Sequence, residues 1–159
     1  MSKSNKIHTL ANSNWKMKMF MLKQLPMGFI AGLKVTSIDK KGATVTVPNK
    51  FVNKNPFKSM YFAVQAMAAE LSSGILALAE VYVAEKPVSM LVINMNASYT
   101  KKARTKVSFR CDFAQEIKNT IAKSIETGEG QLVEVKSVGT DKEGDIVAEF
   151  TFTWTFKPK

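Results

Sequence analysis

Glu70 is the single charged residue between Lys58 and Glu80, in a segment that is otherwise almost entirely apolar or small. An unpaired carboxylate is costly to bury, so such a group usually shifts its pKa or finds a partner. One interpretation is that Glu70 does chemistry from a partly dry cleft, as a base that activates water or as a nucleophile that attacks a carbonyl carbon. The other is that it is a helix residue reaching solvent or a lysine of a neighbouring subunit.

Asn55 and Ser73 could complete such a site. Asn55 followed by Pro56 has the pattern of a helix start, which predicts a central helix from residue 55 to about residue 83. The unpaired N–H groups and partial positive charge of a helix N-terminus suit a developing oxyanion, although Asn55 would cap the helix in any case. Ser73 could hydrogen-bond the carboxylate or a water, or could mark close helix packing together with its small neighbours.

Glu70 and Asn55 are too far apart to act together within one continuous helix. Their 15-residue separation corresponds to about four turns and roughly 22 Å. The two groups would meet only if a second subunit brought its own helix start alongside Glu70. The aromatic strand at residues 146–156 and the all-round apolar helix offer more hydrophobic surface than a small monomer hides. A homodimer is therefore predicted, and pairing of dimers into a tetramer is left open.

Other catalytic classes lack the residues that they need. His8 is the only histidine and Cys111 the only cysteine, so neither a His-based triad nor a His/Cys metal site is expected. Neither GxxxxGK[ST] nor GxGxxG occurs, and no cofactor is expected. The single cysteine fits a reducing compartment, and the first 25 residues lack a signal-peptide core. A cytoplasmic location is therefore expected.

Alternating segments flank the central helix and are predicted to be strands in three antiparallel pairs. The pairs are residues 33–39 with 43–48, residues 88–100 with 105–113 across the turn Lys101–Arg104, and residues 131–139 with 146–156. Residues 115–125 fit either a short helix or a continued strand.

The N-terminal part is predicted to be a flexible tail over residues 1–9, followed by a helix over residues 10–24. Trp15, Met19 and Leu22 fall on one stripe of that helix. An antiparallel sheet wrapped around one long central helix satisfies both the alternating strands and the all-round apolar helix. The predicted class is therefore α+β, with residues 10–159 as a single domain.

This order of elements, together with two motifs, resembles the hotdog-fold thioesterases, in particular the phenylacetate-pathway type and its uncharacterised branch, domain of unknown function 4442. Asn55 and Glu70 match the Asn and the acid of the family's helix-start pattern at the right spacing. Tyr61, Phe62 and Ala63 occupy the positions of the family's His-Gly-Gly, and Lys58 that of an earlier Gly. The stretch SYTKKARTKV at 98–107 resembles the family's strand–turn–strand.

The resemblance implies an acyl-CoA thioesterase whose site is shared between two subunits, with Glu70 as the catalytic carboxylate and Asn55 and the helix start polarising the thioester oxygen. Tyr61 could donate a hydrogen bond there, or simply pack in the core, and Phe62 and Ala63 would border the substrate. The changed His-Gly-Gly positions favour the alternative of a hotdog protein that binds acyl-CoA or an acyl chain without hydrolysing it.

The charge of the chain favours an anionic partner. The net charge is +10, and residues 1–54 hold 10 lysines against one acid. Lys101, Lys102 and Arg104 crowd one turn that could hold the phosphates of coenzyme A, or could be solvated surface. No nucleic-acid-binding motif is present, so nucleic acid is not the expected partner. A membrane span over residues 59–79 is not expected either, because Glu70 would lie at its centre.

Overall fold

The computed structural model describes residues 14–159, so the flexible tail predicted for residues 1–9 lies outside the described residues. Six strands form one sheet in the order β1-β2-β4-β5-β6-β3, and every neighbouring pair is antiparallel. The elements along the chain are α2 (Asn14–Gln24), α3 (Pro26–Ala31), β1 (Lys34–Ile38), β2 (Ala43–Val47), the 3-10 turn η1 (Phe51–Asn53), α4 (Phe62–Val83), β3 (Val88–Tyr99), β4 (Val107–Cys111), α5 (Ala114–Thr127), β5 (Gln131–Thr140) and β6 (Ile146–Pro158).

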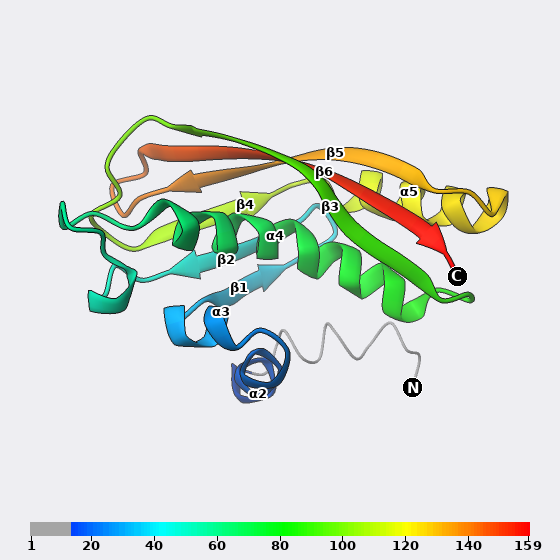
Figure 1. The fold of residues 1–159 in the computed structure, drawn as a ribbon, viewed down its shortest axis with the longest axis horizontal. Coiled ribbons are helices and arrows are strands. Elements are labelled where there is room, and N and C mark those ends of the chain that lie inside the picture. Colours follow the sequence, from blue (N-terminus) through cyan, green and yellow to red (C-terminus); the bar gives the residue numbers. More distant parts are fainter. Residues whose placement is uncertain (1–13) are drawn as a thin grey trace.

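The sheet curves around α4, which confirms the predicted α+β class and its single central helix (Figure 1). α4 packs on β2, β4 and β5 and on α5. By length and composition this helix could cross a membrane, but 61% of its most apolar window is buried inside the fold. A helix that is apolar on nearly all sides is expected where other elements cover it on several sides. Its hydrophobicity is therefore accounted for by its place in the core.

The strand faces follow the alternation in the sequence. Ala43, Val45 and Val47 of β2 are fully buried, and the two threonines between them are half-buried. On β6, Phe150, Phe152, Trp154 and Phe156 all face the core. The predicted β1–β2 and β5–β6 hairpins are confirmed. Residues 115–125, for which helix and strand were both open, are helical within α5.

The predicted hairpin between the third and fourth strands is wrong. β3 pairs with β6 from Val88 to Tyr99, whereas β4 lies between β2 and β5. The turn at residues 101–104 therefore carries the chain across the sheet instead of reversing it within a hairpin. β3 becomes an edge strand of 12 residues, and most of its length is exposed. Alternation within a strand predicts which side chains point inward, but not which strand lies beside it.

The predicted start of the central helix at Asn55 is also wrong, because α4 begins at Phe62. The Asn55 side-chain oxygen accepts hydrogen bonds from the N–H of Phe57 at 3.0 Å and the N–H of Ser59 at 3.3 Å, so it caps a tight turn and not the helix. Lys58 adopts a left-handed conformation with φ 61° in that turn. An Asn that bonds the backbone two residues ahead offers the chain an alternative to helix.

The N-terminal helix α2 buries a face other than the stripe of Trp15, Met19 and Leu22. Met17 and Met21 pack into the core, while Trp15 and Leu22 of the predicted stripe face outward. The helix ends at Gln24, as predicted, and Pro26 begins a second helix, α3, for which its fixed φ is suited. α2 packs against α3 at the periphery of the molecule (Figure 1).

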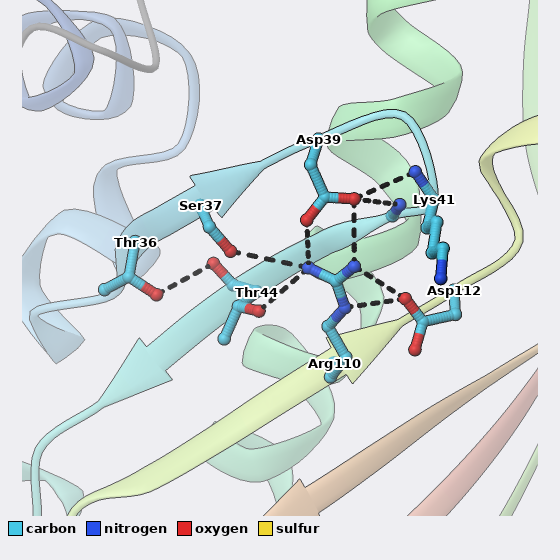
Figure 2. A network of polar contacts seen from close by, with 8 residues as sticks. Thr36, Ser37, Asp39, Lys41, Thr44, Arg110 and Asp112 are labelled. Carbon is cyan, nitrogen blue, oxygen red and sulfur yellow. Dashed lines mark hydrogen bonds and ion pairs between the residues drawn. The ribbon is translucent and has the colours of Figure 1, made fainter.

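A charged network on the outer face of the sheet joins the end of β1 to β4. Figure 2 shows Arg110 of β4 reaching past Thr44 of β2 to Asp39, with Nη1 2.9 Å from Asp39 Oδ2 and Nη2 2.6 Å from Asp112 Oδ1. Asp39 also accepts from the N–H groups of Lys41 and Gly42. The Arg110 guanidinium and these N–H donors hold the pKa of the Asp39 carboxyl well below its usual range. The network therefore ties the β1–β2 turn to β4.

Candidate active site

Glu70 lies on α4 and lines a pocket of about 280 Å³. We call this hollow the acid pocket; its other walls are the segment from Gln24 to Gly28, Leu33, and Met67 and Leu71 of α4. A Cβ at Gly74, one turn further along α4, would lie 2.8 Å from Glu70 Oε1. Gly74 therefore leaves the room in which the carboxylate rests against its own helix.

Burial raises the pKa of Glu70 from 4.5 to about 6, and no hydrogen bond or neighbouring charge within residues 14–159 contributes to that shift. Desolvation alone disfavours the ionised form of a carboxyl group. A carboxylate with a pKa near neutrality is a stronger base than an exposed one and is still ionised at physiological pH. These are the properties that a general base needs.

Ser73 does not reach the Glu70 carboxylate. Its hydroxyl is fully buried, donates to the Glu70 backbone carbonyl at 3.0 Å and accepts from Trp154 Nε1 at 3.0 Å. The two bonds anchor the Glu70 turn of α4 to β6. The hydroxyl is therefore engaged within the fold, and Ser73 joins α4 to β6 instead of bonding the Glu70 carboxylate.

Asn55 lies in a second and larger pocket, of about 570 Å³. We call it the loop pocket; it is lined by residues of the loop 55–62, by Gln65 of α4 and by residues 99–103. The Asn55 side-chain oxygen is occupied by Phe57 N–H, Ser59 N–H and the Ser59 hydroxyl. Since these bonds fix which end of the amide is oxygen, its NH₂ is the group left to donate to a ligand.

The N-terminus of α4 opens beside Asn55 even though Asn55 is not its cap. Tyr61 is the N-cap residue and makes no capping hydrogen bond with its side chain. Within residues 14–159, the first carbonyl bonds of this helix come from the N–H groups of Val64 and Gln65 to Tyr61 O, so those of Phe62 and Ala63 are unpaired. Such donors can stabilise negative charge on an oxygen.

The aromatic side chains at this helix start are exposed. Tyr61 and Phe62 line the loop pocket and meet edge to face at 4.8 Å between ring centroids, and Phe62 meets Tyr99 of β3 at 6.4 Å. Ala63, half-buried on the first turn, does not line the pocket. Phe62 thus lines the loop pocket at the first turn of α4, beside the unpaired helix N–H groups.

The three basic residues of the turn have three different surroundings. Lys101 Nζ is held by Asp141 at 2.7 Å and by Asp145 at 2.6 Å, and these hydrogen bonds raise its pKa. Lys102 Nζ lies 5.9 Å from the centre of the Phe57 ring at the loop pocket. Arg104 is exposed and does not line the pocket. The basic turn therefore offers one unpaired cation to the pocket, not three.

Gln65 is a pocket residue that sequence reasoning missed. It is almost completely buried, and its Oε1 accepts no hydrogen bond within residues 14–159, while its Nε2 donates a long bond of 3.4 Å to Met60 O. Buried polar atoms are nearly always paired, so an unpaired acceptor that lines a cavity points to a ligand or a water. The signal in the sequence was a polar residue within an apolar segment, the same signal that singled out Glu70.

The two pockets are separate in one chain. Glu70 comes eight residues after the start of α4, which places it about 12 Å further along the helix axis than the donors at its N-terminus. The structure thus brings Asn55, Tyr61, Phe62 and Lys102 together, and it leaves Glu70 in a pocket of its own. Among residues 14–159, no three His, Cys, Asp or Glu side chains gather as a metal site would require.

The family model described as domain of unknown function DUF4442 matches residues 13–156. No curated protein matches the chain at a significant level.

Solved structures with the same architecture come from several bacteria. PA5026 of Pseudomonas aeruginosa, described as a probable thioesterase, is 17% identical with a TM-score of 0.75 over 91% of this chain and 96% of its own. Thioesterase HI1161 of Haemophilus influenzae is 16% identical with a TM-score of 0.66 over 92% and 91%. The Escherichia coli PaaI protein from the phenylacetic acid degradation operon is 12% identical with a TM-score of 0.60 over 91% and 94%.

Likeness at these identities shows the fold, and the neighbours are hotdog-fold thioesterases. The resemblance inferred from the helix-start pattern is thereby confirmed at the level of family and fold. The chain belongs to the DUF4442 family and has the hotdog fold.

Proposed function

We propose that the protein is a thioesterase that hydrolyses acyl-CoA, with Glu70 as the catalytic carboxylate. The observation that carries the proposal is a half-buried carboxylate with a pKa of about 6 that lines a pocket and has no partner among residues 14–159. Glu70 takes a proton from water as the water oxygen attacks the thioester carbonyl carbon. The carbonyl oxygen becomes negatively charged, and when the C–S bond breaks the leaving thiolate receives the proton that Glu70 took from water, which regenerates the carboxylate.

The donors for that oxyanion would come from the loop pocket of a second subunit. Asn55 NH₂ and the N–H groups of Phe62 and Ala63 are the unpaired donors there. Two features support a homodimer. The acid and the donors lie in different pockets of one chain, and the long edge strand β3 exposes apolar side chains such as Leu91, Ile93 and Met95. Exposed edges of this kind invite pairing with another chain.

Coenzyme A matches the charge and the hydrogen-bonding groups of the loop pocket. Its phosphates are anionic, and Lys102 is the cation of the basic turn that lines the pocket without a carboxylate partner among residues 14–159. Its pantetheine arm contains amide N–H groups, which can donate to the unpaired Gln65 Oε1. Phosphate and amide recognition would thus come from two sides of one cavity.

Lys102→Ala is expected to weaken coenzyme A binding by about 10-fold and to reduce the salt dependence of that binding, because one charge-assisted contact is lost. Arg104→Ala is the matched control, since Arg104 belongs to the same turn but lies outside the pocket. Isothermal titration at two salt concentrations measures both quantities. An equal loss of coenzyme A affinity in the two variants would mean that binding depends only on the net charge of the protein.

Gln65→Leu is expected to separate ligand binding from stability. The substitution removes a buried, unpaired oxygen, so the free energy of unfolding should stay the same or rise by about 1 kcal/mol. Affinity for coenzyme A should fall, because the acceptor for the pantetheine amide is gone. Urea unfolding and titration with coenzyme A measure the two effects. A destabilised variant with unchanged affinity would show that Gln65 is structural.

The second candidate function is binding of acyl-CoA without hydrolysis. Phe62 favours it, because this bulky residue, 53% exposed, lines the loop pocket at the start of α4, where the proposed N–H donors lie.

A thiol-release assay on the purified protein, with acyl-CoA substrates of increasing chain length, separates the two functions. Release of free coenzyme A above the rate of a Glu70→Gln preparation supports the thioesterase. Saturable binding of acyl-CoA with no release supports the binding protein and refutes catalysis.

A further inference from the structure

Helix α2 carries two apolar faces, and only one of them is used by the fold. Met17 and Met21 are 5% and 2% exposed and face the core. Trp15, Met19 and Leu22 form a stripe on the other side, which we call the outer stripe. Trp15 is 71% exposed and Leu22 46%, and Met19 is half-buried. At 100° per residue these three positions fall within about 60° of one another, opposite the two buried methionines.

The outer stripe is bordered by lysines on both sides. The same helical spacing puts Lys18 on one flank and Lys16 and Lys23 on the other, and all three are exposed. Asp39 is the first acidic residue of the chain, so α2 itself contains no carboxylate to balance these charges. Lysines that flank an apolar stripe can extend their ammonium groups toward anionic headgroups while their stems cover apolar surface.

α2 is also placed where a large flat partner can reach it. It packs mainly against α3, on the side of α3 away from the sheet, at one edge of the molecule (Figure 1). Exposed apolar side chains continue in the following segment, at Met27 and Ile30. Isolated apolar residues are normal on a protein surface, but a tryptophan and a leucine on one stripe between lysines combine residue types that a membrane interface accommodates.

We propose that the outer stripe of α2 docks on an anionic lipid bilayer, with Trp15 and Leu22 inserted at the headgroup level and Lys16, Lys18 and Lys23 over the anionic lipids. The charge complementarity selects a bilayer with negative headgroups over a neutral one. A single short helix gives weak and reversible attachment that salt reverses. The end of α2 and the start of α3, Gln24 to Gly28, form a wall of the acid pocket, so attachment would hold that pocket close to the lipid surface.

The test is vesicle co-sedimentation of the full chain, which does not depend on the proposed hydrolysis. Vesicles of phosphatidylcholine with a minority of phosphatidylserine are compared with vesicles of phosphatidylcholine alone. Binding is expected only to the anionic vesicles and should be lost at high salt. Trp154 is 3% exposed, so a blue shift of fluorescence on binding would come from Trp15 and should vanish in Trp15→Phe.

Two variants separate the outer stripe from the overall positive charge. Replacing Lys16, Lys18 and Lys23 by Gln is expected to weaken vesicle binding by about 10-fold or more. Replacing Lys118, Lys123 and Lys142 by Gln removes the same charge from exposed sites outside α2 and should leave most of the binding intact. The double variant Trp15→Ser, Leu22→Ser should also lose binding while the protein stays folded by circular dichroism.

Three results would overturn the proposal. Equal loss in the two lysine variants would mean that the net charge alone attracts the vesicles. No binding of the folded protein to anionic vesicles would leave the outer stripe as a surface for a protein partner. A change from dimer to monomer in the Trp15→Ser, Leu22→Ser variant, seen by sedimentation, would assign the stripe to contact between copies of this chain.

Discussion

Glu70→Gln should lower thioester hydrolysis by about 10²-fold or more while leaving the fold and the oligomeric state unchanged. The substitution keeps the shape of the side chain and removes its capacity to accept a proton from water. No hydrogen bond from residues 14–159 contributes to the pKa of the Glu70 carboxylate. The substitution therefore leaves no donor among these residues without its acceptor. The rate of thiol release and the circular dichroism spectrum measure the two parts of this expectation.

The pH dependence of the parent enzyme should report the same group. With a pKa of about 6, Glu70 is ionised above that pH, so the rate should fall as the pH drops through 6 and should be flat just above it. In Glu70→Gln this step should be missing from any residual activity. A pH profile that is the same in parent and variant would assign the titration to another group.

Glu70→Gln should also stabilise the protein at neutral pH. The folded state holds the Glu70 proton up to about pH 6, whereas the unfolded chain releases it near pH 4.5. The stability that this proton provides is complete below pH 4.5 and is lost as the pH rises through 6, a loss of about 2 kcal/mol. Gln cannot ionise and avoids that loss, so the gain of the variant should appear above pH 6 and fade below 4.5. Urea unfolding at several pH values measures it.

Glu80→Gln is the matched control for the rate of thiol release, its pH profile and urea unfolding. Glu80 lies on the same helix but not in the acid pocket. Its rate should stay close to that of the parent. If Glu70→Gln hydrolyses thioesters as fast as the parent, the carboxylate is structural and the proposed site is wrong.

Met95→Glu should convert the proposed homodimer to monomers and, with it, abolish hydrolysis. Met95 of β3 pairs across from Phe152 of β6, on the face of the sheet that holds the core, yet 44% of the residue is exposed in the single chain. In a monomer the new carboxylate can reach water. In a dimer that covers this part of β3 it would be buried without a partner, which should raise the dissociation constant by about 10²-fold or more.

Sedimentation at micromolar concentration and thiol release measure the two effects of Met95→Glu together. Leu132→Glu is the control, since Leu132 is an exposed apolar residue on β5, a strand in the interior of the sheet order and not at its edge. It should stay dimeric and active. A monomeric parent protein that hydrolyses thioesters would contradict the shared site, because Glu70 and Asn55 line separate pockets in one chain.

Several features of the site could be predicted from the sequence because they depend on local composition. Glu70 stands out as a lone acid in an apolar helix, and burial is the cause of its raised pKa. The strand faces follow from alternation, as on β6, where every second residue from Phe150 to Phe156 is buried. The end of the central helix also agrees, with α4 ending at Val83.

Other features depended on partners distant in the sequence. Ser73 could not be assigned without Trp154, and Lys101 without Asp141 and Asp145, because each contact joins residues at least 40 positions apart. Asn55 was read as a helix cap because its type suits that role, but the same side chain also suits the turn that it stabilises.

The sequence by itself determined the spacing of apolar residues in each helix and strand, and therefore which residues share a face. The tertiary structure decided which face turns inward and which strand lies beside which. α2 illustrates the first decision. It has two apolar faces, and the one with Met17 and Met21 is buried while the one with Trp15 and Leu22 is exposed. β3 illustrates the second, because its partner β6 is nearly 60 residues away while β4 follows directly. Periodicity is local, whereas strand pairing and burial are settled by the free energy of the whole core, in which many nonlocal contacts are formed together.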